Sequence, residues 1–295
     1  MMNQQDLQGI YVPVITPFLP NGELDPDSYR TYVGKLLAHN IQGLVINGTT
    51  GESPTVTWEE VTALTMATKA QMQGASVPVV IGTGTNDTAA TVKQTEMAAQ
   101  LGADGVLVVV PYYSRPSQEG IIEHFRRVAQ VGIPVIVYEI PARTGVRLTV
   151  DTARTIMEMD GVIGMKDSSG GTELVSALSR LASKPVLCGE DVYFYDALRA
   201  GAAGGIMASA SVNTDSFREV YRLAAKGMFE EAGTAFERLL PLIRLLFQES
   251  NPTPLKWLLA RQGIIAGDTV RLPLTSISRG LADTLERFLF SHECT

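Results

Sequence analysis

One lysine, Lys166, stands at the end of an apolar run, where its amine could do covalent chemistry. The run extends from Val162 to Met165, and Lys166 closes it. Burial against a packed interior disfavours the charged ammonium, and a neutral amine can attack a ketone and form an imine. Five of the other six lysines fall in helical stretches, and Lys184 precedes a later run. Lys166 is therefore the candidate nucleophile; the alternative is that it reaches solvent or pairs with Asp167.

The preceding apolar run offers two further groups, Tyr138 at its end and Arg143 in the loop that follows. A phenol near the amine could move protons while a carbinolamine collapses to an imine, although a tyrosine at a strand end is equally often structural. A guanidinium in such a loop suits a substrate carboxylate, which it binds through two hydrogen bonds. The alternative for Arg143 is an ion pair with Glu139.

The loop after the second run, residues 47–52, reads Asn-Gly-Thr-Thr-Gly-Glu. Its glycines let the backbone approach a ligand, and the hydroxyls of Thr49 and Thr50 join the backbone amides in a small anion cradle. No Gly-Lys-Ser/Thr follows, so this is not a phosphate-binding P-loop. Tyr112 and Tyr113 follow the fourth run, and we expect them at an exposed rim, where one lines the site or a subunit contact.

Other catalytic arrangements have weak support in the sequence. The histidines lie in helical stretches and the cysteines lack metal-ligand spacing, which disfavours a metal site or a histidine-based triad. These residues are His39, His124, His292, Cys188 and Cys294. Cys188 ends the seventh run, and we expect it to be a small core residue. The site is therefore predicted to hold no metal.

The elements that must position these groups form a repeating strand and helix pattern. Eight short apolar runs begin at Ile10, Gly43, Pro78, Gly105, Ile133, Val162, Pro185 and Gly204. Successive runs begin about 20 to 35 residues apart, which is the length of one strand, helix and return. Apolar runs without alternation are typical of parallel strands covered on both faces. Eight such units predict an α/β fold, a (β/α)₈ barrel, with its catalytic groups at the carboxyl ends of the strands.

Helix signals complete the pattern. Thr57 and Glu60 form a capping-box pattern, which opens a helix that runs to about Gln73. After the eighth run, residues 216–225 complete the last barrel helix, and three more helices are expected over residues 229–247, 254–262 and 277–290. We therefore predict a catalytic barrel of residues 1–226 and a C-terminal helical domain of residues 227–295, packed as one unit.

Composition narrows the classes of function. The 295-residue chain is 45% hydrophobic and 19% charged, as expected of a globular protein. The net charge is −7 with no block of basic residues, which disfavours nucleic acid or an anionic membrane as a partner. No apolar stretch is long enough to span a bilayer, and the polar amino terminus lacks a secretion signal. These features predict a cytoplasmic protein that acts on small molecules.

Five motifs in register give the chain a resemblance to a known enzyme family. They are Gly48-Thr49-Thr50-Gly51-Glu52, Pro111-Tyr112-Tyr113, Tyr138 with Pro141, Arg143 and Thr144, Gly164-Met165-Lys166, and the segment from Asn251 to Lys256. Taken together, they span nearly the whole chain, and it resembles the dihydrodipicolinate synthase and N-acetylneuraminate lyase superfamily. The resemblance implies a TIM barrel with a C-terminal helical domain, assembled as a homotetramer that is a dimer of dimers.

The resemblance also implies roles for individual residues. Lys166 would form an imine with pyruvate, without a cofactor. The proton relay would consist of Tyr138, Thr49 and Tyr113, with Tyr113 contributed across a subunit interface. The pyruvate would be held by Gly48, Thr50 and Ile206.

Two positions bear on the second substrate. Members similar to dihydrodipicolinate synthase carry an arginine matching Arg143, which binds the carboxylate of aspartate semialdehyde. Those members usually have asparagine where this chain has Glu139, and a carboxylate there could repel an acidic aldehyde or pair with Arg143. We therefore expect a class I pyruvate-dependent lyase that uses aspartate semialdehyde, or alternatively an aldolase or dehydratase for another 2-keto acid such as a 2-keto-3-deoxy sugar acid. A non-catalytic binding barrel is disfavoured, because it has no chemical need for a buried amine.

Overall fold

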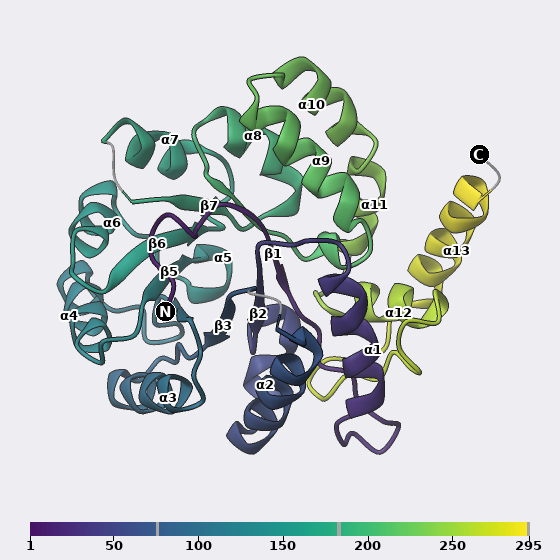
Figure 1. The fold of residues 1–295 in the computed structure, drawn as a ribbon, viewed down its shortest axis with the longest axis horizontal. Coiled ribbons are helices and arrows are strands. Elements are labelled where there is room, and N and C mark those ends of the chain that lie inside the picture. Colours follow the sequence, from purple (N-terminus) through teal and green to yellow (C-terminus); the bar gives the residue numbers. More distant parts are fainter. Residues whose placement is uncertain (75–76, 182–183, 294–295) are drawn as a thin grey trace.

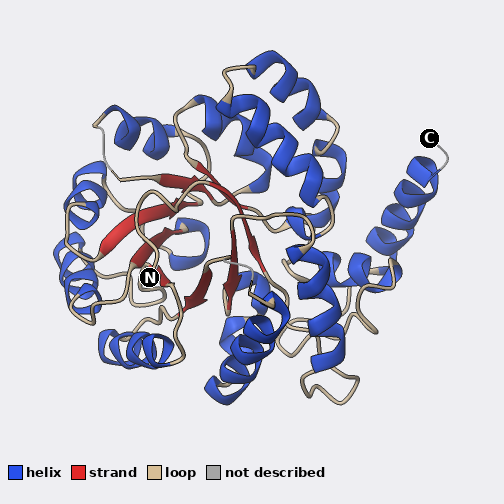
Figure 2. Cartoon of the chain, viewed as in Figure 1, coloured by secondary structure: helices blue, strands red, loops and turns tan. Residues whose placement is uncertain are grey.

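The computed structural model describes residues 1–74, 77–181 and 184–293, and in them eight parallel strands close into a barrel (Figure 1, Figure 2). The strands are β1 Gly9–Pro13, β2 Gly43–Ile46, β3 Val79–Gly82, β4 Gly105–Val109, β5 Val135–Glu139, β6 Val162–Asp167, β7 Val186–Cys188 and β8 Gly204–Ile206. Each strand pairs with the next, and β8 pairs with β1. All eight predicted runs are strands, which confirms the (β/α)₈ barrel.

Helices that follow the strands form the outer layer of the barrel (Figure 1). They are α1 Pro26–Leu37, α2 Trp58–Met72, α3 Thr88–Gln100, α4 Gln118–Ala129, α6 Val150–Met157, α7 Glu173–Arg180, α8 Phe194–Arg199 and α9 Thr214–Ala225. The short helix α5 Pro141–Thr144 lies inside this ring of helices (Figure 1). The predicted capping box opens α2, because Thr57 Oγ1 accepts the amide of Glu60 and the Glu60 carboxylate accepts the amide of Thr57. This exchange satisfies two amides of the first turn.

In the described part of the chain, four C-terminal helices follow the barrel, one more than the sequence predicted. They are α10 Phe229–Glu237, α11 Leu240–Leu246, α12 Thr253–Arg261 and α13 Arg279–Glu293. The expected single helix over residues 229–247 is wrong. Pro241 has no amide hydrogen to continue α10, and it occupies the first turn of α11, where that amide is not needed. The domain boundary after residue 226 stays a prediction.

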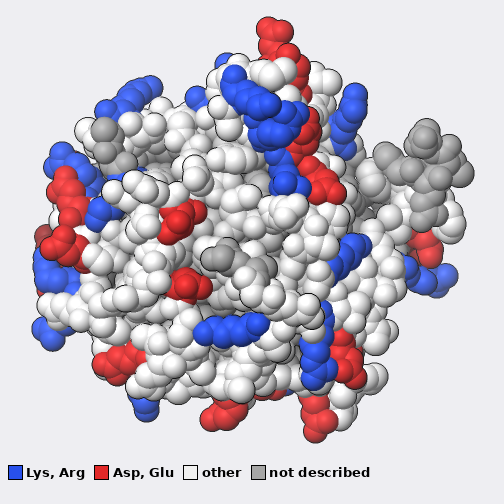
Figure 3. Space-filling model, in the orientation of Figure 1, with Lys and Arg blue, Asp and Glu red and all other residues white. Residues whose placement is uncertain are grey.

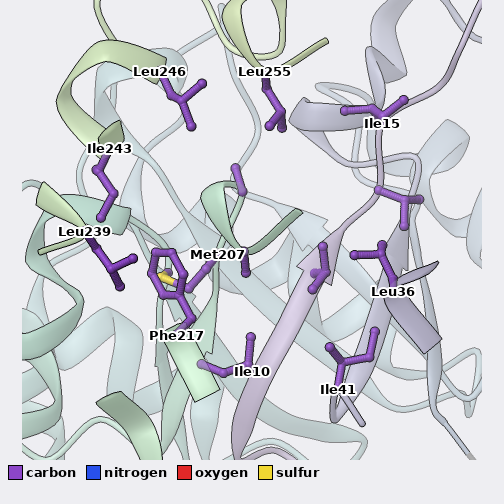
Figure 4. Close-up of a cluster of buried hydrophobic side chains, with 14 of the residues drawn as sticks. Ile10, Ile15, Leu36, Ile41, Met207, Phe217, Leu239, Ile243, Leu246 and Leu255 are labelled. Atoms are coloured by element: carbon purple, nitrogen blue, oxygen red, sulfur yellow. The ribbon is translucent and has the colours of Figure 1, made fainter. Parts of the chain in front are cut away.

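Buried side chains join the C-terminal helices to the barrel. Inside the barrel, the strands contribute Tyr11, Ile136 and Leu187 to an apolar cluster. A second cluster lies outside the strands and contains residues of β1, α11 and α12 together (Figure 4). Its members include Ile10, Met207, Leu239, Ile243, Leu246 and Leu255. The helices at the end of the chain therefore share a core with the first strand, whereas most of α13 extends away from the barrel (Figure 1).

The register of β5 and β6 places the side chains of Tyr138 and Lys166 next to each other. Tyr138 pairs with Lys166, and Glu139 pairs with Asp167. In a parallel pair, residues in register point to the same face and the next residues point to the other. Tyr138 belongs to the cluster inside the barrel. Lys166 therefore shares the interior with Tyr138, while Glu139 and Asp167 face the helix layer.

The surface agrees with the charge pattern of the sequence. On the face shown in Figure 3, basic and acidic side chains are interspersed. None of the described helices is long and apolar enough to cross a membrane. Cys294 and the side chain of His292, both considered above, lie outside the described residues.

Candidate active site

A cavity of about 430 Å³ lies at the carboxyl ends of the strands. Its lining includes Lys166 and Tyr138 from β6 and β5, Thr49 and Thr50 from the loop after β2, Arg143 from α5, and Ile206 from β8. Six residues predicted from the sequence are thus brought to one place. The barrel achieves this because the loops after parallel strands converge on one end.

Lys166 is 6% exposed, and its Nζ lies 4.2 Å from the centre of the Tyr138 ring. No ion pair joins Lys166 to another described residue, and Asp167 accepts the amide of Ser169 at 2.9 Å instead. The alternative pairing of Lys166 with Asp167 is therefore wrong. Gly189, after β7, leaves room for the lysine, because a Cβ atom there would lie 2.6 Å from Lys166 Cε. The amine is buried, next to a phenol, and faces an open cavity.

Two acidic residues after β7, Glu190 and Asp191, line the same cavity. The Asp191 carboxylate accepts the amides of Ser209 at 2.6 Å and Ala208 at 3.3 Å. Burial raises the pKa of both carboxyl groups, and the charge of Lys166 acts in the opposite direction on each. Neither residue was predicted from the sequence, because an acidic pair after a three-residue strand resembles an ordinary polar loop.

The predicted anion cradle is held by residues near the end of the chain. Asn251 Nδ2 donates to Thr50 Oγ1 at 2.9 Å, which leaves the Thr50 O–H free to donate elsewhere. Glu52 ends the cradle with φ of +58°, and its buried carboxylate accepts Lys256 Nζ at 2.7 Å and the amide of Arg271 at 3.0 Å. The C-terminal helical region therefore fixes the loop that carries Thr49 and Thr50.

Two predicted residues lie outside this cavity. Gly48 lines a neighbouring pocket, which shares Thr49, Tyr138 and Arg143 with the first. Tyr113 is 89% exposed and lines neither pocket. Its φ of +70° is unusual for a bulky residue. Within a single chain, Tyr113 does not reach the cavity of Lys166.

Two arginines reach the cavity from different parts of the chain, Arg143 from α5 and Arg244 from α11. Both are exposed, and neither forms an ion pair with a residue that the structure describes. The alternative pairing of Arg143 with Glu139 is wrong, because Glu139 is fully buried and accepts the amide of Leu148 at 3.0 Å. Arg244 was not predicted, because it lies in a helix far from any strand end. Both guanidinium groups can receive an acidic ligand.

His39, His124 and Cys188 do not line this cavity. Cys188 is buried, its thiol donates to the carbonyl of Glu190 at 3.3 Å, and burial raises its pKa, as suits a core residue. His39 contacts Asp215 at 2.9 Å, and burial lowers the pKa of His124 to about 4. No group of three or more His, Cys, Asp or Glu side chains is arranged for a metal ion among the described residues.

Known sequences place these features in a family. A model of the Dihydrodipicolinate synthetase family matches residues 6–291. The chain belongs to this family. A 4-hydroxy-tetrahydrodipicolinate synthase 2 from Clostridium acetobutylicum is 36% identical over 288 residues, which cover 96% of this chain and 99% of that relative. The expected family and lyase class are confirmed.

Solved structures of dihydrodipicolinate synthases have the same fold. The chloride-inhibited enzyme from Acinetobacter baumannii in complex with pyruvate has a TM-score of 0.92 and 33% identity, with 96% of this chain and 98% of that chain covered. A monomeric dihydrodipicolinate synthase variant has a TM-score of 0.93 and 34% identity, with 97% of both chains covered. At least 96% of the chain therefore follows the fold of these synthases.

Proposed function

We propose that this chain is a 4-hydroxy-tetrahydrodipicolinate synthase, which condenses pyruvate with aspartate semialdehyde through an imine on Lys166. The observation that carries the proposal is one cavity that joins a buried amine, a phenol, a hydroxyl-lined cradle and an unpaired guanidinium. The relative from Clostridium acetobutylicum bears this name, and the structure from Acinetobacter baumannii was solved with pyruvate.

Imine formation uses the groups at the inner end of the cavity. Lys166 Nζ attacks the keto carbon of pyruvate, and the carbinolamine then loses water to leave the imine. Tyr138 lies beside the amine and moves protons as the hydroxyl leaves. The pyruvate carboxylate is received by Gly48, Thr49 and Thr50, and Ile206 contacts the apolar side. Because Asn251 donates to the Thr50 oxygen, the Thr50 hydroxyl can donate to that carboxylate.

Condensation uses the outer part of the cavity. Loss of a methyl proton converts the imine to an enamine, which attacks the aldehyde carbon of the second substrate, and the aldehyde oxygen takes up a proton. The amino group of that substrate then attacks the imine carbon and displaces Lys166, which closes the ring and restores the free amine. Arg143 binds the carboxylate of that aldehyde through charge-assisted hydrogen bonds. Glu139 lines neither pocket, so it does not repel an acidic aldehyde. The departure from asparagine at this position therefore does not count against aspartate semialdehyde.

The proposal extends to assembly and location. We propose a cytoplasmic homotetramer, a dimer of dimers, in which Tyr113 enters the site of a neighbouring subunit and completes the proton relay with Tyr138 and Thr49. The high exposure and positive φ of Tyr113, and its absence from its own cavity, support this arrangement. No separate cofactor is needed, because the imine itself is the electron sink.

A substrate comparison tests the proposed function. Purified protein should consume pyruvate with aspartate semialdehyde and should form a cyclic product that absorbs after dehydration. Beside it, a panel of 2-keto-3-deoxy sugar acids should be cleaved at least about a hundredfold less efficiently in kcat/KM. Preferred cleavage of a sugar acid would replace the synthase with the alternative aldolase.

A further inference from the structure

Glu139 and Asp167 are two buried carboxyl groups that the proposed reaction does not use. They are 0% and 4% exposed, and they directly follow Tyr138 and Lys166. They pair in register across β5 and β6. Residues in register on neighbouring parallel strands point to the same face, with their backbones about 4.8 Å apart. The two side chains therefore share the outer face of the barrel wall, and burial, together with the charge of Asp167, raises the pKa of Glu139.

Each carboxyl group has one satisfied oxygen and one without a partner. Glu139 Oε1 accepts the amide of Leu148 at 3.0 Å, and Asp167 Oδ1 accepts the amide of Ser169 at 2.9 Å. Glu139 Oε2 and Asp167 Oδ2 are shielded from solvent and have no hydrogen-bond partner among the described residues. A buried polar atom without a partner is costly, and two adjacent buried negative charges are more so.

We propose that Glu139 and Asp167 share one proton, with the Oε2–H of Glu139 donating to Oδ2 of Asp167. A single hydrogen bond then satisfies both unpartnered oxygens and removes one of two adjacent buried charges. The bond joins β5 to β6 one residue beyond Tyr138 and Lys166, on the opposite face of the same two strands. Glu139 is therefore a positioning residue, which fixes the distance between the phenol and the amine.

The groups that face this pair from neighbouring elements are compatible with one retained proton. Arg147, in the loop after α5, is exposed and is the cation whose field reaches both carboxyl groups. Cys188 on β7 is protonated, and Glu190 adds negative charge beside Asp167. Burial raises the pKa of Glu139 to about 7 and raises that of Asp167 above its ordinary value, while hydrogen bonds from Ser169 and Val175 act against the shift of Asp167 and favour its charged form. Glu139 therefore keeps its proton at pH values at which an exposed glutamate has already lost it.

A shared proton makes stability depend on pH in a defined window. The folded chain keeps the Glu139 proton to about pH 7, whereas an unfolded chain loses it near the ordinary glutamate pKa of 4.5. The stability from this proton is fully present below pH 4.5 and is lost as the pH rises through about 7. Within the window, the unfolding equilibrium constant should rise by up to about tenfold per pH unit from this group.

Two variants remove the need for the proton. In Glu139→Gln and in Asp167→Asn, an amide N–H can make the bond between the strands, and the remaining oxygen can still accept the amide of Leu148 or Ser169. Glu158→Gln is the matched control, because Glu158 is a carboxyl group with a 72% exposed side chain. Denaturant unfolding from about pH 5 to 8 should show the pH slope in wild type and control, and a flatter slope in both test variants.

An infrared difference spectrum gives a second readout. Wild type minus Glu139→Gln, measured near the middle of the window at about pH 6, should contain a protonated-carboxyl band that shifts in D₂O. Equal unfolding slopes in wild type and in whichever test variant folds, together with no such band, would overturn the shared proton.

The positioning role rests on the proposed functions of Tyr138 and Lys166, and a kinetic profile tests it. The kcat of wild type should fall more steeply above about pH 7 than that of Glu139→Gln, with little difference in KM for pyruvate. Identical kcat profiles beside different unfolding slopes would confine the pair to stability and overturn positioning. Absence of a pyruvate adduct on Lys166 in every protein would instead contradict the proposed function.

Discussion

Two buried lysines, Lys166 and Lys256, occupy similar surroundings, but only Lys256 has an ion-pair partner among the described residues. Their exposures are 6% and 0%. Each Nζ lies over an aromatic ring, 4.2 Å from the centre of Tyr138 for Lys166 and 4.4 Å from the centre of Phe18 for Lys256. Lys256 Nζ also bonds to the Glu52 carboxylate at 2.7 Å and to a backbone carbonyl at 2.9 Å. Lys166 has no ion pair with any described residue and faces the cavity.

The difference shows that burial alone does not make a lysine reactive. Burial lowers the pKa of Lys256, and the charge of Glu52 acts against that shift. The amine of Lys256 is committed to holding the loop that contains Thr49 and Thr50. Lys166 has a phenol beside it and space in front of it, so a substrate carbonyl can approach. Lys256 therefore stabilises the site, and we propose that Lys166 performs its chemistry.

The largest expected effect is that of Lys166→Ala. Removing the nucleophile should lower kcat with pyruvate and aspartate semialdehyde by at least about a thousandfold, because no other amine lines the cavity in the described part of the chain. The free energy of unfolding should change by less than about 2 kcal/mol, since no ion pair is broken. Steady-state assays and denaturant unfolding measure both. If Lys166→Ala retained turnover, Lys166 would not be the nucleophile, and the contrast with Lys256 would be wrong.

Lys256→Met should have a large effect on stability and a small effect on imine formation. It leaves the Glu52 carboxylate buried beside an apolar side chain, and breaking a buried ion pair in this way costs about 3 to 5 kcal/mol of unfolding free energy. The folded fraction should still form an imine on Lys166. Lys35→Met, at an exposed position on α1, is the matched control and should change stability little. Equal stabilities of the two variants would show that the ion pair does not hold the loop.

Arg143→Ala should weaken the reaction with the aldehyde substrate and leave the reaction with pyruvate nearly unchanged. If Arg143 binds the carboxylate of the aldehyde, its loss should cost about 1.5 to 3 kcal/mol in kcat/KM for that substrate. Imine formation with pyruvate should be nearly unchanged, because in the proposed reaction the loop with Thr49 and Thr50, and not Arg143, binds the pyruvate carboxylate. Rapid trapping of the imine and steady-state kinetics measure the two steps. An equal loss in both would assign Arg143 to structure.

A smaller effect is expected for Arg244→Ala. Arg244 lines the same cavity but is exposed, and contacts of exposed charges are worth about 0.2 to 1 kcal/mol. The change should appear in KM for the acidic aldehyde and should decrease with added salt. Arg244→Lys should restore part of it. A loss as large as that of Arg143→Ala would make Arg244 an equal partner in binding.

The barrel and the inner part of the site could be predicted from the sequence because their signals are local. Parallel strands covered on both faces leave continuous apolar runs, and even the three-residue strand β8 was recognised. Lys166 and Tyr138 stand out because each is a polar group within or at the end of such a run. Their convergence then follows from the barrel, which brings the loops after the strands together.

The remaining features depend on contacts between distant residues. Lys256 lies 204 positions from Glu52, and nothing in its helix indicates that it is buried. Arg244 and Asn251 reach the cavity because the C-terminal helices share a buried cluster with the barrel. The outward direction of the Glu139 side chain could have been predicted from the sequence. Side chains alternate along β5, so the residue after an inward Tyr138 points outward. Its partner oxygen on Asp167 required the register between the strands.

The central claim is that Lys166, and not Lys256, reacts with pyruvate. Borohydride added with pyruvate reduces an imine to a stable secondary amine, and mass spectrometry of the digested protein locates it. The account predicts one adduct, on the peptide that contains Lys166, and none in Lys166→Ala. An adduct on Lys256 or another lysine, or no adduct in the wild-type protein, would contradict it.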